Sequence, residues 1–183
     1  PTPPSEAPRT QDQINLTDED SRIMKVAGGG FEQCYNAQAV VDTESMLVLV
    51  PQVTQAANDK EQVAPMLAEL KALPEGLNSP KELLADNGYL SEANVEVCID
   101  AKVEPLIAAG REGHHPDWKD RFGEPPPLPE EASPVEKMRH RLKTPAGKKQ
   151  YALRKQTVEP VFGILKSVMG FRQFLLRGLE QAG

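Results

Sequence analysis

A strand, an acid, a turn, a helix and a second strand follow one another in residues 81–108, KELLADNGYLSEANVEVCIDAKVEPLIA. The apolar run 83–85 ends at Asp86, and the Asp-Asn-Gly sequence that starts there is typical of a turn. Ser91 then stands as a capping residue before a helical pattern, and residues 103–108 form the next apolar run. Two strands joined through a helix predict parallel pairing and an α/β fold.

Asp86 is the first candidate site residue. An acid at the carboxyl end of a strand in an α/β sheet lies where such sheets bind their ligands. The same residue also suits a purely structural role, because aspartate before Asn-Gly favours a turn. Both interpretations remain open at this point.

Two further strands are predicted upstream. Residues 31–42 alternate between two faces, and residues 47–54 are rich in β-branched and apolar side chains, so the two runs predict a hairpin. The glycines at 28–30 favour a bend before it, after a charged, turn-like segment. Asp59, with Gln62 three residues later, predicts the capping box of a helix that ends near Leu73.

Two helices are predicted downstream, because Ser133-Pro134 and Thr144-Pro145 each place a capping hydroxyl before a proline. The second helix should end near Gly170 and kink at Pro160. Its core-facing stripe follows helical spacing. The stripe comprises Tyr151, Val158, Val161, Phe162, Leu165, Val168 and Met169.

The other face of this helix carries charge. Glu159 and Lys166 are seven positions apart, which places them on one side of a helix, and Arg154 lies nearby. A carboxylate here can hold a divalent cation while the basic groups contact phosphates. A self-paired, solvated helix surface is the alternative.

The composition fits one globular domain, with 183 residues of which 39% are hydrophobic. There is neither a run of about 18 apolar residues nor a secretory leader, which predicts a cytoplasmic protein. Cys34 and Cys98 are too few for a disulfide framework. Residues 1–17 are expected to be a flexible lead-in, 18–183 the domain, and 110–132 a long polar loop.

Charge is distributed unevenly. The formal net charge is −6, but from Lys137 to the end there are eleven lysines and arginines and only two acids. Such asymmetry favours a polyanionic partner for the basic end, with a solubilising surface as the alternative. His114 and His115 lack the spacing of a metal site, and a surface position in the loop is favoured for both.

Five segments together resemble the ribonuclease-H-like DDE transposases of bacterial insertion sequences. They are DSRIM (20–24), GFEQCYNAQAVVD (30–42), AND (57–59), ADNGY (85–89) and VEPVFG (158–163). The resemblance implies a mixed sheet with helices on both faces. It also implies cleavage and strand transfer of double-stranded DNA with Mg²⁺ or Mn²⁺, and a homodimer on DNA.

Within this resemblance, Asp86 matches the second catalytic acid and Glu159 the third. Tyr151, Arg154, Glu159 and Lys166 are similar to the tyrosine-arginine-glutamate-lysine signature of the family, although four residues separate Arg154 from Glu159, one more than usual. The catalytic and metal residues are therefore Asp86 and Glu159, and the DNA-binding residues are Tyr151, Arg154 and Lys166.

The first acid of the family belongs to a strand before the hairpin, and nothing between Pro1 and Gly30 resembles that strand. Asp42 is the strand-associated acid nearby. The resemblance thus implies a C-terminal portion of a transposase that lacks its first strand, inactive by itself. A non-catalytic DNA-binding remnant and a metal-dependent nuclease without strand transfer are the alternatives.

Overall fold

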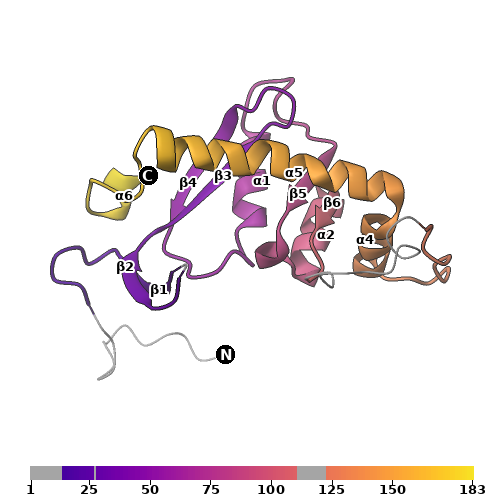
Figure 1. The fold of residues 1–183 in the computed structure, drawn as a ribbon, viewed down its shortest axis with the longest axis horizontal. Coiled ribbons are helices and arrows are strands. Elements are labelled where there is room, and N and C mark those ends of the chain that lie inside the picture. Colours follow the sequence, from indigo (N-terminus) through magenta and orange to yellow (C-terminus); the bar gives the residue numbers. More distant parts are fainter. Residues whose placement is uncertain (1–13, 27, 111–122) are drawn as a thin grey trace. The chain divides into compact units, whose positions relative to one another are not determined.

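The computed structural model describes residues 14–26, 28–110 and 123–183, which form a mixed α/β protein (Figure 1). Two compact units can be distinguished. The larger comprises residues 37–52 and 58–173, and the smaller combines the N-terminal part up to Asn36 with residues 53–57 and 174–183. Residues 1–13 of the predicted lead-in and residues 111–122 of the predicted loop, including His114 and His115, lie outside the described residues.

The α/β unit predicted from residues 81–108 is confirmed. Strand β5 (Glu82–Ala85) pairs in parallel with β6 (Glu104–Ile107). Between them come the short helix η1 (Asn87–Tyr89) and helix α2 (Glu92–Asp100). Ser91 caps α2 by accepting a hydrogen bond from the Asn94 amide, because its hydroxyl satisfies a backbone donor that the first helical turn leaves unpaired.

The hairpin forms with different bounds. Strand β3 (Asn36–Val41) pairs with β4 (Val48–Thr54), whereas residues 31–34 form the separate strand β2 (Phe31–Cys34). Strand β2 pairs antiparallel with β1 (Arg22–Lys25), so the predicted charged, turn-like segment at 16–25 contains turns in its first part, but residues 22–25 form a strand. The bend at Gly28–Gly30 explains the pairing, because all three glycines have positive φ and reverse the chain there.

Helix α1 (Val63–Lys71) packs against α2 in the main core of the larger unit. Its buried side chains Val63, Met66, Leu67 and Leu70 follow helical spacing. They meet Val50, Cys98 and Val103, and the hydrophobic effect of burying these groups stabilises the unit. Both cysteines are free thiols.

Two capped helices complete the larger unit. Helix α4 (Pro134–Lys143) begins with a full capping box between Ser133 and Glu136, and α5 (Pro145–Gly163) begins at Thr144, whose hydroxyl accepts from the Gly147 amide. Both predicted starts are confirmed. Helix α5 contains Pro160 and continues as the π-helical turn η2 (Ile164–Val168).

The predicted apolar stripe of α5 is buried only in part. Val161 is buried, but Val168 and Met169 are 79% and 55% exposed. The apolar pattern therefore continues past the buried part of the helix. The prediction that Val168 and Met169 face the core was wrong.

The smaller unit holds β1, β2 and the short helix α6 (Leu179–Ala182). Asp18 accepts hydrogen bonds from the Tyr35 hydroxyl and the Gly178 amide, and the Tyr35 ring meets Phe174 edge to face. Residues close to the two ends of the chain are thereby joined. Among the residues described, no helix is long and apolar enough to cross a membrane.

Candidate functional site

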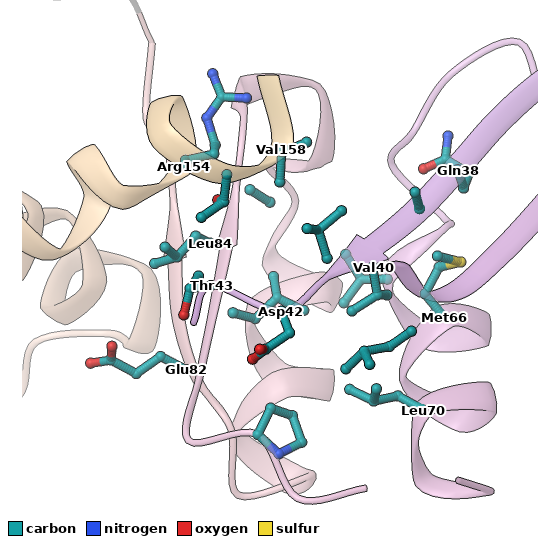
Figure 2. A pocket seen from close by; sticks show the side chains of 18 of the residues that line it. Gln38, Val40, Asp42, Thr43, Met66, Leu70, Glu82, Leu84, Arg154 and Val158 are labelled. Carbon is teal, nitrogen blue, oxygen red and sulfur yellow. The ribbon is translucent and has the colours of Figure 1, made fainter. Parts of the chain in front are cut away.

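A cleft of about 770 Å³ lies in the larger unit between strands β3 and β5. Helix α1 contributes Met66 and Leu70 to its lining, and α5 contributes Val158 (Figure 2). Gln38 and Arg154 lie toward one end of the cleft and Asp42 and Glu82 toward the other (Figure 2). Because β5 runs from Glu82 toward Asp86, the first of these ends is the carboxyl end of β5.

The cleft meets the edges of both strands. Successive side chains of a strand point to opposite faces, yet residues 37–42 and residues 82–86 line the cleft without a gap. Among the described strands, β3 pairs with β4 alone and β5 with β6 alone. The two edges that border the cleft therefore present unpaired backbone groups to it.

Asp86 follows β5 directly and stands at the start of the turn that leads into α2. Its Oδ1 accepts a hydrogen bond of 2.8 Å from the Gly88 amide, and its backbone carbonyl accepts from the Tyr89 amide at 3.3 Å. The side chain of Asp86 is 49% exposed. One oxygen thus serves the turn, and the second faces Arg154.

Arg154 brings Asp86 and Glu159 to the same place. Its guanidinium lies 3.9 Å from Asp86 Oδ2 through one terminal nitrogen and 3.2 Å from Glu159 Oε1 through the other. Both carboxylates therefore lie next to one guanidinium group, whose positive charge attracts both of them. The Nε of Arg154 is buried and has no hydrogen-bond partner among the described residues.

Tyr151 supports the same corner from α5. Its hydroxyl donates a hydrogen bond of 3.2 Å to the Ala85 carbonyl, next to Asp86. Its ring lies 5.9 Å from the Arg154 guanidinium carbon, within the range of a cation–π interaction. Burial raises the pKa of the Tyr151 hydroxyl, which therefore stays a donor at neutral pH.

Lys166, the remaining residue of the predicted set, lies on η2. Its ammonium group is 5.5 Å from the centre of the Phe162 ring. None of the ion pairs in the described part of the chain includes Lys166. The structure thus brings Asp86, Tyr151, Arg154 and Glu159 together, while Lys166 is exposed and engaged with Phe162.

Asp42 lies in the β3–β4 turn. Its carboxylate accepts hydrogen bonds from the Ser45 amide and hydroxyl at 2.7 and 2.6 Å, which lower the pKa of this carboxyl. These bonds give Asp42 a local function in the hairpin.

Three residues near Asp86 were missed as site residues: Gln38, Asp59 and Tyr89. The Tyr89 hydroxyl donates to the Gln38 side chain, whose amide group donates to Asp59 Oδ1 at 2.7 Å. The prediction that Asp59 caps α1 was wrong, since the helix begins after Gln62 without a side-chain cap. The signal in the sequence was that all three residues lie in segments that resemble the family, 30–42, 57–59 and 85–89.

The donor set at this corner suits a hard divalent cation, because Asp86 and Glu159 offer carboxylate oxygens. No group of three His, Cys, Asp or Glu side chains within residues 14–26, 28–110 and 123–183 is close enough to hold a metal ion. Among the described residues, the two carboxylates that meet at Arg154 are therefore the candidate ligands.

The family described as "Transposase DDE domain" matches residues 5–182 of this sequence. Searches among curated proteins and among solved structures gave no match.

Proposed function

Because the chain belongs to the transposase DDE domain family, we propose that it serves DNA transposition, by metal-dependent cleavage and strand transfer at the ends of a bacterial insertion sequence. The observation that carries this proposal is the convergence of Asp86 and Glu159 on Arg154 at the carboxyl end of β5. Ligands bind at this end of the strands in α/β proteins.

In the proposed site, Asp86 and Glu159 would hold Mg²⁺ or Mn²⁺ through their carboxylates. Such an ion supplies an activated oxygen nucleophile and stabilises the charge on the leaving oxygen. Arg154 holds the two carboxylates toward each other, and Tyr151 fixes Arg154 through its ring and β5 through its hydroxyl.

The DNA backbone binds to the basic surface of the C-terminal helices. Six of its residues are exposed on α4, α5 and η2: Lys137, Arg139, Lys143, Lys149, Lys155 and Lys166. Contacts to phosphates fix the position of a duplex without reading its sequence. Arg154 would reach DNA only by exchanging its present carboxylate partners for phosphate. We further propose a cytoplasmic protein that acts as a homodimer, because joining two element ends needs two active sites.

We also propose that these 183 residues are the C-terminal portion of a ribonuclease-H-like domain whose first strand occupies the cleft. Both edges that border the cleft are unpaired, and helices α1 and α5 contribute apolar side chains to its lining. A strand antiparallel to β3 would run parallel to β5 and end beside Asp86, where the first acid of the family is needed. Asp42 is poorly suited to that role, because both its Ser45 bonds belong to the turn.

The test is a cleavage assay with DNA from both flanks of the coding sequence. It compares the 183-residue chain with a protein extended upstream by the residues encoded in frame before Pro1. We expect Mg²⁺-dependent nicking and joined products from the extended protein alone. Efficient cleavage by the 183-residue chain would contradict the proposal that it is incomplete.

Glu159→Gln in the extended protein should abolish cleavage and leave DNA binding within about twofold, because the amide keeps the shape and loses the negative charge that holds the ion. Asp42→Asn is the matched control and should cleave normally. Cleavage retained by Glu159→Gln removes Glu159 from the site.

A non-catalytic DNA-binding remnant is the second candidate. It is favoured by the lack of a three-acid group among the described residues and by the pairing of both carboxylates with Arg154. A remnant predicts DNA binding that weakens steeply with salt and does not respond to Mg²⁺. It also predicts no cleavage by the extended protein.

A further inference from the structure

Gln38 is a buried polar residue on β3, and only 5% of it is exposed. Its side chain connects two segments that are distant in sequence. The amide nitrogen donates to Asp59 Oδ1 at 2.7 Å, and the amide oxygen accepts from the Tyr89 hydroxyl. Burial makes these bonds important, because a buried amide without partners costs free energy.

The chemistry of the two partners requires a carboxamide between them. An ionised carboxylate can only accept hydrogen bonds, and a phenol donates its single proton. Burial, together with the negative charges of Asp59 and Asp86, raises the pKa of the Tyr89 hydroxyl, which therefore keeps that proton. Glutamine offers a donor to Asp59 and an acceptor to Tyr89 at the same time.

Tyr89 belongs to the turn that carries Asp86. Its amide donates to the Asp86 carbonyl, and its own carbonyl accepts from the Asn94 side chain at 2.6 Å. Asn94 in turn is buried at the start of α2. Fixing the Tyr89 side chain therefore fixes the turn on which Asp86 is presented.

Gly88 shows how closely this turn approaches Asp59. A Cβ atom on Gly88 would lie 2.9 Å from Asp59 Oδ2 and 3.0 Å from Asp86 Oδ1. A side chain on Gly88 would therefore displace one of these carboxylate oxygens. Gln38 binds Oδ1 of Asp59, and Oδ2 of the same carboxylate lies next to the turn that carries Asp86.

We propose that Gln38 is a positioning residue for Asp86, acting through Tyr89 and Asp59 on either side of the turn that presents the Asp86 carboxylate. This inference rests on the proposed function for the role of Asp86 in metal binding. Gln38 would thus be a residue of β3 that serves the site, although β3 contributes neither of the proposed catalytic acids.

The test measures Mn²⁺ affinity of the 183-residue chain by isothermal titration calorimetry. Gln38→Leu should weaken binding about 10-fold, the usual cost of losing a group that orients a metal ligand. In an Asp86→Asn background the same substitution should have no further effect, because its influence passes through Asp86. Equal weakening in both backgrounds, or none in either, overturns the proposal.

Gln52→Leu on β4 is the matched control, since its amide oxygen is also buried but has no hydrogen-bond partner in the described part of the chain. It should leave Mn²⁺ affinity unchanged. If Gln52→Leu weakens binding as much as Gln38→Leu, the effect is a general loss of packing and the proposal fails.

A second readout needs no metal. Hydrogen exchange at the amides of Gly88 and Tyr89 should be faster in Gln38→Leu and in Tyr89→Phe than in the unmodified chain, and unchanged in Gln52→Leu. Unchanged exchange in Gln38→Leu overturns the positioning role. Failure of the unmodified chain to bind Mn²⁺, together with faster exchange, instead counts against the proposed function and leaves Gln38 as the residue that holds the turn.

Discussion

Asp59 illustrates, at the scale of single residues, where local patterns mislead. Its position three residues before Gln62 predicts a helix cap, but the carboxylate instead accepts a hydrogen bond from Gln38, 21 positions earlier. Capping patterns describe bonds between near neighbours, whereas this bond exists only after β3 has come to lie beside the start of α1. By contrast, the position of Asp86 between a strand and a turn was predicted correctly, because a strand followed by an acid and a turn is a local feature.

The hydrogen bond between Tyr35 and Asp18 should make the stability of the smaller unit depend on pH. Asp18 accepts a hydrogen bond from the Tyr35 hydroxyl, and this bond is the main reason why the pKa of Asp18 lies below 3.8. Its stabilising contribution is therefore complete above that value and is lost as pH falls through the lowered pKa. Burial, and next the bond to Asp18, raise the pKa of Tyr35 from 10.0 to about 12. The stabilising contribution of the Tyr35 hydroxyl is therefore present below pH 10 and is lost as the pH rises toward 12.

Tyr35→Phe tests this prediction, because it removes the hydroxyl and keeps the ring that packs on Phe174. Thermal unfolding midpoints should be lower for the variant between about pH 5 and pH 9, and the difference should shrink below about pH 4 and above about pH 10. A difference that stays constant from pH 3 to pH 11 would show that the hydroxyl contributes by packing alone.

Helices were easier to predict than strands at the scale of elements. The starts of α2, α4 and α5 are each marked by a serine or threonine cap, and each cap forms. Strand β1 carried no such mark, because Arg22–Lys25 has one buried side chain and becomes a strand only through its partner β2. The sequence also does not show where a buried apolar stripe ends, because burial of a residue such as Val168 depends on whether another element packs against it.

Two glycines of α5 should respond oppositely to alanine. A Cβ on Gly147 would lie 1.9 Å from the Arg141 carbonyl oxygen, which is backbone and belongs to the end of α4. Gly147→Ala should therefore open the α4–α5 junction and destabilise the chain by about 2–3 kcal/mol. A Cβ on Gly163 would meet no described atom within 4 Å, so Gly163→Ala should stabilise the chain by about 0.5–1 kcal/mol.

Urea unfolding of both alanine variants checks these signs. Because the two substitutions add the same methyl group to the same helix, their difference isolates the close approach at Gly147. Equal effects would mean that α4 and α5 do not meet as tightly as the distance to Arg141 indicates.

The sequence predicted the α/β class and the acid-bearing strand at the scale of the whole molecule, but not the cleft between β3 and β5. A cleft is a property of surfaces that come from several elements, among them α1, α5, β3 and β5, and no spacing within one segment encodes it. The convergence of Asp86 and Glu159 on Arg154 is similarly non-local. It joins a turn to a helix some seventy positions further along the chain.

The distribution of charge is also a property of the whole chain. The net charge of −6 hides a basic C-terminal part that we propose as the DNA surface. Binding of a random-sequence duplex should therefore weaken steeply between about 50 and 200 mM salt, as counterions compete for the phosphates. Lys149→Gln together with Lys155→Gln should reduce the salt dependence, measured by fluorescence anisotropy. An unchanged slope would place the DNA elsewhere.

The most direct measurement is a Mn²⁺ titration of the unmodified chain and of Asp86→Asn, Glu159→Gln and the double variant. If the two carboxylates share one ion, each single substitution should weaken binding about 10-fold or more, and the double variant should be little weaker than either, because neighbouring groups of one site are not additive. Asp42→Asn should bind as the unmodified chain does. Full affinity in either single variant, or losses that simply add in the double variant, would contradict a shared site.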